Sequence, residues 1–447
     1  MVVAWQRVEK FLAGLPPASL VLSGFLVLIL GGALVLLLPV MVTPGNHLHP
    51  LDALFTATSA ICVTGLIVVD TASFFSFWGQ LVILILIQIG GLGYMTITTL
   101  LAMAVRRRIE YRDRLALRDS FSLDVPGGVV RFVIAVLKYT FFVEGVGALI
   151  LFFNFLRYFP ARQALFGAIF HSISAFCNAG FSVFSTNLEK FVLDPVVNCT
   201  MMGLIILGGI GFVVMKEVVE ERGLLSLHAR VVVTTTLILI LGGTFLVLLL
   251  EWDNPRTLGE LPLWGKIMAG FFQAVTPRTA GFNTVPIGSL HPATAVFLMF
   301  LMFVGASPGG TGGGVKTSTL AILGGLIWSF LQGRERVEFF HRRVASSAVY
   351  RAVALTGLAF ALIFVSGIFL VALQETEVLN TFFEVVSAFG TVGLSRGLTP
   401  YHSQVGKIVL ILNMYLGRVG ILTALLSFRL AQERRELLTY PEEKILV

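Results

Sequence analysis

The sequence is poor in charge. Of its 447 residues 13% are charged, about half of the roughly 25% usual in soluble domains, while 56% are hydrophobic. A soluble chain of this length would fold into about two to four domains, and each would need a polar surface. So little charge cannot cover such domains. The composition therefore excludes a soluble globular protein.

Cysteine is scarce as well. The three cysteines, Cys62, Cys177 and Cys199, have neither the spacing of zinc ligands nor an even number for disulfide pairing. The apolar stretches also lack a cluster of His, Asp or Glu that could perform chemistry. We therefore expect no tightly bound cofactor and no enzyme activity.

Long apolar runs take up most of the chain. About 20 apolar residues cross the core of a bilayer, so each long run predicts a membrane-spanning helix. The first run is too long for a signal peptide and lacks a cleavage site after it, so we expect it to be retained. The runs cover residues 20–38, 81–89, 129–156, 231–250, 295–304, 352–373 and 408–426.

Basic residues are concentrated in alternate loops, whereas loop 39–52 has no Lys or Arg and loop 374–381 carries two Glu residues. Because arginine-rich loops stay in the cytoplasm, we predict a multi-pass protein of the cytoplasmic (inner) membrane with both termini cytoplasmic. The net charge of +7 is then a topology signal, and nucleic acid is not an expected partner. The arginines are Arg106, Arg107, Arg108, Arg112, Arg114, Arg118, Arg334, Arg336, Arg342, Arg343, Arg429, Arg434 and Arg435.

Four short segments of the chain share one frame, in which a Phe precedes a Gly by ten residues. We call the three residues that end at each such Gly a glycine segment. A single Gly after a short helix is ordinarily a C-cap, but four at one offset from a shared Phe favour a common function. The glycine segments are Val63, Thr64 and Gly65; Asn178, Ala179 and Gly180; Thr279, Ala280 and Gly281; and Thr391, Val392 and Gly393.

One plan surrounds each glycine segment: a long apolar helix, a half-length amphipathic helix, the segment itself and a second apolar helix. The half-helices are too short to span a bilayer, which predicts re-entrant segments. The predicted fold class is an all-α membrane protein with eight spanning helices and four half-helices around one central pore. The half-helices fall at about 51–62, 164–177, 266–277 and 379–390, in repeats 18–105, 128–222, 229–332 and 347–432, before a cytoplasmic tail at 433–447.

Four re-entrant loops around one axis are the arrangement of an ion filter. Loop backbone inside a bilayer must be buried in protein or line water. Gly allows successive carbonyls to point inward, and a ring of such carbonyls replaces the hydration shell of a cation. The C-terminal, partly negative ends of the half-helices would face the ion. We therefore predict that backbone carbonyls of the glycine segments bind K+, with the side chains supporting the loops.

This plan resembles the Trk/Ktr/HKT superfamily of cation transporters over essentially the whole chain. In that superfamily Gly at all four filter positions accompanies K+ selectivity, and Ser at the first accompanies Na+ transport; this chain has Gly65. The absence of an extra N-terminal pair of spans and the tail Tyr440-Pro441-Glu442-Glu443-Lys444 are similar to the Ktr-type membrane subunits. The resemblance implies K+ uptake, either with or without Na+ coupling.

The second apolar helices carry a further repeated pattern. Gly90-Gly91-Leu92-Gly93 in the first repeat matches Gly208-Gly209-Ile210-Gly211 in the second and Gly417-Arg418-Val419-Gly420 in the fourth. Small residues allow helices to approach closely, so we expect these glycines to pack against a neighbouring helix. In repeats one, two and four we expect the second span to be one continuous helix.

A Gly-rich stretch at 305–316 interrupts the second span of the third repeat. Pro and many glycines cannot hold a helix, and the stretch lacks the Gly that a phosphate-binding loop needs before its Lys. The resemblance implies an intramembrane gate below the filter, and a simple helix break near the cytoplasmic surface is the alternative. The predicted gate residues are Gly305, Pro308, Gly309, Gly310, Gly312, Gly313, Gly314, Lys316 and Arg418.

Arg418 belongs to this gate because a charge within a span costs about 3 kcal/mol on insertion scales and usually faces a cavity. We expect it to pair with carbonyls near Gly310–Gly314 and to repel cations in the closed state. Snorkelling to the membrane interface is the alternative. Glu144, inside another span, either pairs with Lys138 or faces a helix contact.

The resemblance also implies partners. Ktr-type membrane subunits form a homodimer seated on a cytosolic ring of nucleotide-binding, KtrA-like regulatory subunits. Loops 106–118 and 333–345 and the C-terminal tail are the expected docking surfaces, and membrane lipid headgroups are the alternative contact for their arginines. A secondary solute transporter with a broken-helix site at 305–316 is the competing function, although repeats of one orientation favour a pore.

Overall fold

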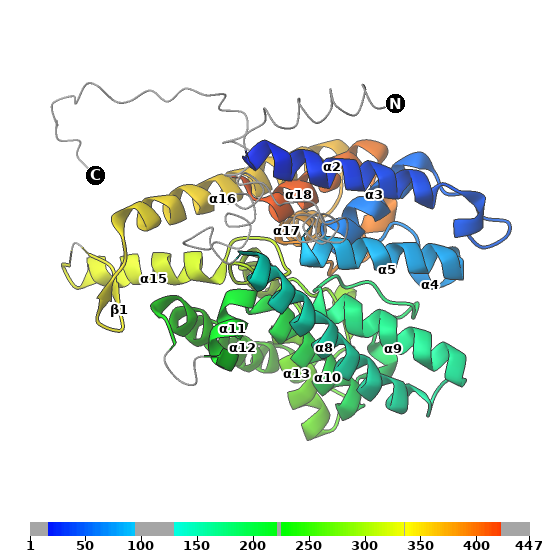
Figure 1. Cartoon of the computed structure of the whole chain (residues 1–447), viewed down its shortest axis with the longest axis horizontal. Coiled ribbons are helices and arrows are strands. Elements are labelled where there is room, and N and C mark those ends of the chain that lie inside the picture. Colours follow the sequence, from blue (N-terminus) through cyan, green and yellow to red (C-terminus); the bar gives the residue numbers. More distant parts are fainter. Residues whose placement is uncertain (1–16, 94–128, 221–224, 335, 422–447) are drawn as a thin grey trace.

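A computed structural model describes residues 17–93, 129–220, 225–334 and 336–421. These residues are helical apart from loops and one hairpin of two short strands, β1 (Glu338–Phe339) and β2 (Arg342–Arg343). The helices with the earliest and the latest residues, α2 (Pro17–Leu36) and α18 (Gln404–Val419), lie near each other (Figure 1), and the Tyr415 hydroxyl donates to the Leu22 carbonyl oxygen at 2.7 Å. The first and the last helix of the described residues are thus in contact.

Three continuous helices in the described residues are long and apolar enough to cross a bilayer. They lie within α8 (Val129–Phe155), α12 (Leu227–Glu251) and α16 (Ser346–Gln374). A fourth span forms if α10 (Pro195–Gly209) and α11 (Phe212–Glu220), bent by 103°, count as one. The total of eight spans stays a prediction.

The long helices present apolar side chains to their surroundings. Phe142 on α8, Leu241 on α12 and Phe360 on α16 are 71%, 62% and 63% exposed. Exposed apolar side chains in such numbers are normal only where lipid replaces water. The fold is therefore that of an all-α membrane protein, as predicted.

The half-helices form where the sequence predicts them, to within three residues at each end. Pro at or before the first turn starts several of them, because a residue there needs no backbone donor. Each half-helix ends just before its glycine segment, and its C-terminal residues are buried. The half-helices are α3 (Pro50–Ile61), α9 (Ala161–Phe176), α13 (Leu263–Val275) and α17 (Val378–Gly390).

A ring of contacts joins the repeats. The second helix of each repeat packs on the half-helix of the next one along the chain, and the last packs on the first. Small residues also let the second helix approach the half-helix of its own repeat, because a side chain at Gly90, Gly208 or Gly417 would meet the carbonyl oxygen at the end of that half-helix. The pairs are α5 (Phe77–Leu92) on α9, α10 on α13, α14 (Pro292–Phe303) on α17, and α18 on α3.

The prediction of a continuous second span is wrong for the second repeat. Helix α10 ends at Gly209, and Gly211 has a positive φ of 98°, which a helix cannot contain. The backbone of the Gly-rich loop 305–316 takes over the freed hydrogen bonds, because Ser307 N–H donates to the Gly209 carbonyl and Phe212 N–H donates to the Gly309 carbonyl. The backbone groups freed by the break thus bond to protein.

The last glycine of the repeated pattern also ends the helix in repeats one and four, so the prediction of one continuous second helix is wrong there too. Helix α5 ends before Gly93 and α18 ends before Gly420, with positive φ values of 80° and 91°. The first glycine of each repeated pattern therefore serves packing, as predicted, while the last serves as a helix terminator.

A substitution at Gly211 tests this role. Gly211→Ala is expected to destabilise the protein by about 1–3 kcal/mol, because a positive φ is strained for Ala and its Cβ would meet the Pro308 carbonyl oxygen. Thermal unfolding in detergent measures the effect. Gly203→Ala is the control, since Gly203 lies within α10, before the break, and a Cβ there meets nothing within 4 Å; equal melting temperatures for both variants would contradict this role.

Two of the expected docking surfaces, loop 106–118 and tail 433–447, lie outside the described residues. The third, 333–345, contains the β1–β2 hairpin at the end of α15 (Thr317–Leu331), in which Glu338 pairs with Arg343 and Phe339 with Arg342. Arg342 and Arg343 are exposed.

Candidate functional site

The four glycine segments share one backbone conformation. Their first residues, Val63, Asn178, Thr279 and Thr391, have φ values of 57°, 59°, 71° and 51°, and their glycines have φ values between 71° and 93°. Left-handed φ at a β-branched residue is unusual and persists only where the surroundings hold it. The fourfold repeat seen in the sequence is therefore also a fourfold repeat of strained backbone.

The four glycines lie next to one another in chain order. A Cβ at Gly65 would meet the Ala179 carbonyl oxygen, one at Gly180 the Ala280 oxygen, one at Gly281 the Val392 oxygen, and one at Gly393 the Thr64 oxygen. Each repeat thus places one backbone carbonyl against the glycine of a neighbouring repeat. We call this closed set the carbonyl ring.

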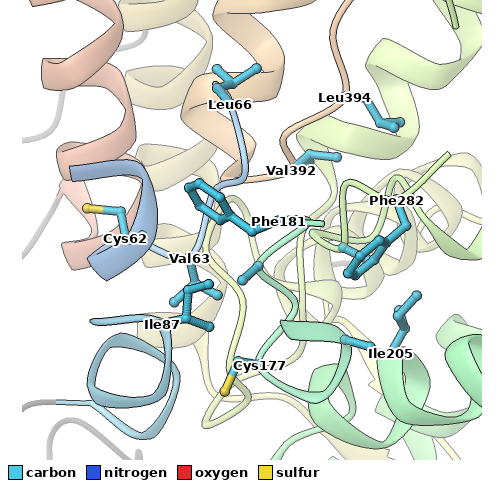
Figure 2. Close-up of a cluster of buried hydrophobic side chains, with 14 of the residues drawn as sticks. Cys62, Val63, Leu66, Ile87, Cys177, Phe181, Ile205, Phe282, Val392 and Leu394 are labelled. Atoms are coloured by element: carbon cyan, nitrogen blue, oxygen red, sulfur yellow. The ribbon is translucent and has the colours of Figure 1, made fainter. Parts of the chain in front are cut away.

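Buried side chains surround the carbonyl ring. Thr64, Ala179, Ala280 and Val392 have no exposed surface. Figure 2 shows Val63 and Val392 near the centre of the cluster, with Leu66 and Leu394 above and Cys177 below. Each glycine segment therefore lines the ring, with the end of its half-helix on one side and the following loop on the other.

Hydroxyl groups of the half-helices hold the segments in place. Ser59 accepts from the Gly65 N–H and Ser387 from the Gly393 N–H, both at 3.0 Å. Ser174 donates to the Phe181 carbonyl, and Thr276 replaces it in the third repeat by donating to the Phe282 carbonyl. Ser59, Ser174 and Ser387 each lie four residues after the shared Phe, where the third repeat has Val275. The contact from Thr276 shows that a hydroxyl one residue later is sufficient.

The Gly-rich loop 305–316 lies directly beneath two of the segments. Gly313 N–H donates to the Thr391 hydroxyl at 2.9 Å, and a Cβ at Gly312 would meet the Thr279 hydroxyl oxygen. The Thr311 hydroxyl donates to the carbonyl oxygens of Phe176 and Gly208, which ties the loop to the second repeat. A break confined to the membrane surface would not make these contacts.

Arg418 connects the loop to the first repeat. Its guanidinium donates to the Thr311 carbonyl in the loop and to the Gly90 carbonyl at the end of α5. Lys316 donates to the Gly312 carbonyl at 2.7 Å, within the same loop. Both cations thus bind carbonyl oxygens below the carbonyl ring, and Arg418 does not reach toward a membrane interface.

Sequence reasoning missed a third cation near the ring, and this one is buried. Arg278 directly precedes the third glycine segment and is 4% exposed, yet its one described side-chain partner is the Thr236 hydroxyl on α12, at 3.2 Å. Its neighbours Thr279 and Gly281 were assigned to the filter, and the position equivalent to Arg278 is Cys in the first two repeats. A charged residue where the repeats have an apolar one was the available signal.

Glu144 faces a helix contact, one of the two expected outcomes. Gln88 on α5 donates to its carboxyl at 3.2 Å, and the Cys177 thiol lies 3.8 Å from its other oxygen. Its own backbone carbonyl accepts from the Ser172 hydroxyl. Glu144 therefore joins the first repeat to the end of the second half-helix.

Glu384, in α17, is a further residue that the sequence analysis did not identify. It has no exposed surface, and its carboxyl accepts from the hydroxyls of Ser395 and Thr399, both at 2.5 Å, and from the Arg396 N–H at 3.2 Å. It anchors the loop after the fourth glycine segment to the half-helix before it.

Glu384→Gln is expected to lower the stability by about 1–3 kcal/mol, because Gln keeps only one acceptor oxygen and places an NH2 group against donors that the second carboxyl oxygen accepts from. Thermal unfolding in detergent measures this, with exposed Glu375→Gln in the same repeat as the control. A melting temperature equal to that of the control would show that the anchor contributes nothing.

The apolar helices and the buried carbonyl ring together define an all-α membrane protein of the ion-transporting class. A family model described as TrkH, cation transport protein, matches residues 25–438. The chain belongs to this family, and within the Trk/Ktr superfamily it is of the KtrB type. The family consists of cation transporters, which confirms the prediction that the chain is not an enzyme.

Several relatives match along their whole length. The Ktr system potassium uptake protein B of Bacillus subtilis is 38% identical over 447 residues, covering 100% of this chain and 99% of the relative. The potassium/sodium uptake protein NtpJ of Enterococcus hirae is 37% identical, covering 100% of both chains. The crystal structure of the potassium transporter TrkH from Vibrio parahaemolyticus matches with a TM-score of 0.73 at 19% identity, over 92% of this chain and 84% of that one, which establishes a shared fold.

Proposed function

We propose that this chain takes up K+ across the cytoplasmic membrane through the carbonyl ring. The observation that carries the proposal is the cyclic arrangement in which each repeat places one carbonyl beside the next glycine. Backbone carbonyls replace the water around a dehydrated K+ ion, and no charged side chain is needed. The names of the relatives support K+ as the ion, since they are potassium uptake proteins from several bacteria.

The half-helices supply the electrostatics. All four end with at most three residues between the helix and its glycine segment, so their partly negative C-terminal ends converge on the ring. A cation is favoured there without a fixed negative charge that would hold it too tightly. The conduction pathway then runs through the glycine segments, with residues 63–65, 178–180, 279–281 and 391–393 as the filter.

The Gly-rich loop 305–316 and Arg418 form the gate in this proposal. The loop lies between the ring and the ends of α5, α10 and α18, which is where an ion leaving the filter would travel. Arg418 and Lys316 add positive charge on that path. A shift of the loop would release the Thr311 carbonyl from Arg418, whereas the bond from Lys316 to Gly312 lies within the loop. A closed state of this kind repels cations until the loop moves.

Control of the gate comes from outside the chain. We assign a homodimer on a cytosolic nucleotide-binding ring, with both termini and the basic loops on the cytoplasmic side. The exposed Arg342 and Arg343 of the β1–β2 hairpin fit an acidic docking partner. Na+ coupling is part of the same proposal, because the relative NtpJ is named a potassium/sodium uptake protein.

Growth of a K+-uptake-deficient bacterium tests the proposal. Cells that express this chain together with a nucleotide-binding regulatory subunit should grow at low external K+, and the uptake should be measured with and without Na+. Cells that carry the empty vector should not grow. Verified membrane expression without growth or K+ uptake would overturn the proposed function, and uptake independent of Na+ would remove the coupling alone.

A further inference from the structure

Polar contacts between neighbouring repeats surround the carbonyl ring on the side away from the Gly-rich loop. Four of their residues, Asp70, Ser185, Asn283 and Arg396, follow a glycine of the ring by two to five positions and so belong to the loops that leave the filter. One contact joins each of the four boundaries between repeats, and we call these contacts the inter-repeat bridges. They are Asp70–Ser185, Glu189–Asn283, Arg396 with the loop at 287–290, and Asp52–Lys407.

The first bridge joins repeats one and two. The Ser185 hydroxyl donates to Asp70 at 2.7 Å, and each residue lies five positions after the glycine of its own repeat. The Asp70 carboxyl also caps α4 (Thr71–Phe74) by accepting from the Ala72 N–H and the Ser73 hydroxyl. A capped helix turn therefore fixes the acceptor before the second repeat binds to it.

The second bridge joins repeats two and three. The Asn283 amide donates to the Glu189 carboxyl at 2.8 Å, and the Leu188 N–H donates to the Asn283 carbonyl at 3.1 Å. Asn283 stands two residues after Gly281, so this bridge is closest in sequence to the ring. Burial raises the pKa of Glu189, while the hydrogen bond from Asn283 opposes that shift.

The third bridge joins repeats three and four through Arg396, three residues after Gly393. Its guanidinium donates to the carbonyl oxygens of Ile287, Gly288 and Leu290 at 3.2 to 3.4 Å. Its Nε donates to Asn380 at 2.7 Å, which orients the planar group. Five donors in a fixed plane suit arginine to a set of carbonyls that lysine could not satisfy together.

The fourth bridge closes the circle between repeats four and one. Lys407 on α18 binds Asp52 in the first turn of α3 at 2.6 Å, and their side chains are 15% and 19% exposed. Partial burial makes such a pair stronger than a surface ion pair. Each boundary thus carries a polar bridge of its own chemistry.

We propose that the inter-repeat bridges are positioning contacts that fix the diameter of the carbonyl ring and thereby its preference for K+ over Na+. This inference rests on the proposed function of the ring. The two ions differ little in size, so small outward movements of a repeat alter how well four carbonyls replace the water of one ion. Within the ring the repeats meet through glycines that have no side chains to interlock, so the bridges are placed to hold them at a set distance.

Arg396 gives the first test. Arg396→Ala should lower the ratio of K+ to Na+ uptake by about two- to tenfold, as expected for losing hydrogen bonds that hold the ring. Arg396→Lys should restore part of the ratio, because it keeps the charge but reaches fewer carbonyls. Uptake of both ions is measured in K+-uptake-deficient cells at matched membrane expression, and thermal unfolding is measured on the same variants.

A double-variant cycle gives the second test. Glu189→Ala and Asn283→Ala should each lower the ratio, and the double variant should be no worse than the more affected single variant, because both remove one contact. Asn46→Ala is the matched control, since Asn46 donates its amide to Thr43 at 2.7 Å within a single repeat; its ratio should equal that of the wild type.

Two outcomes separate the inference from the proposed function. If the wild type prefers K+ and all bridge variants keep that preference while only their stability falls, the bridges hold the fold alone and the inference is overturned. If the wild type itself shows no preference for K+, the proposed function of the ring fails first.

Discussion

Replacing Gly65 with Ser is expected to lower the preference for K+ over Na+ by at least about tenfold, equivalent to 1.4 kcal/mol. Gly65 has a φ of 91°, and a Cβ there would meet the Ala179 carbonyl oxygen and the Gly180 Cα. A side chain must therefore displace a carbonyl of the neighbouring repeat. The ring would then replace the water of K+ less well, while the smaller Na+ would lose less.

The control for this variant is Gly31→Ser. Gly31 lies on α2 in the same repeat, and a Cβ there meets nothing within 4 Å. Competitive uptake of K+ and Na+ in cells with matched membrane expression measures both variants against the wild type. An unchanged K+ preference in Gly65→Ser would show that the glycine segments are not the filter.

Arg418→Ala is expected to raise K+ flux by about tenfold in the absence of an activating partner, a change of about 1.4 kcal/mol in the barrier. The guanidinium holds the Thr311 carbonyl of the Gly-rich loop and the Gly90 carbonyl of α5 together. Its removal frees the loop and takes a positive charge from the proposed ion path. Shortening the loop at 309–314 should act in the same direction.

Flux in proteoliposomes without any regulatory subunit measures this effect. Arg351→Ala, which removes an exposed arginine of α16, controls for the loss of one positive charge elsewhere in the chain. Flux that stays at the wild-type level in both Arg418→Ala and the shortened loop would contradict the assignment of the gate.

The sequence predicted the half-helices and the glycine segments well because both depend on local patterns. A short apolar run followed by Gly at a fixed distance from Phe can be recognised within about 11 residues. The four segments come together as a closed ring, and the repeats pack in chain order around it. Repetition supplied the long-range information that a single segment lacks.

The helix breaks at Gly93, Gly211 and Gly420 could not be predicted in the same way. A glycine that packs against a helix and a glycine that ends one look identical in sequence. Gly208 accommodates the Phe176 carbonyl, whereas Gly211, three residues later, takes a positive φ beside Pro308 of another repeat. Only the tertiary contact with the Gly-rich loop distinguishes the two roles.

The sequence analysis also did not identify two buried charged side chains. Glu384 and Arg278 both lie within the repeated Phe-to-Gly frame, but neither residue type is shared by the other repeats, and their partners lie in segments that the sequence does not mark. Arg418 was identified because its counterparts in the repeated pattern are glycines, so comparison between repeats exposed it. The same comparison applied to residue 278 would have revealed a charge where two other repeats have Cys.

We propose above all that the carbonyl ring conducts K+ and discriminates against Na+. Purified protein in proteoliposomes with an inside-negative potential tests it most directly, by measuring K+ and Na+ influx side by side in the presence of the regulatory subunit. We expect K+ influx well above Na+ influx, and a loss of that difference in Gly65→Ser but not in Gly31→Ser. Equal influx of the two ions in the wild type, or no cation influx at all, would contradict it.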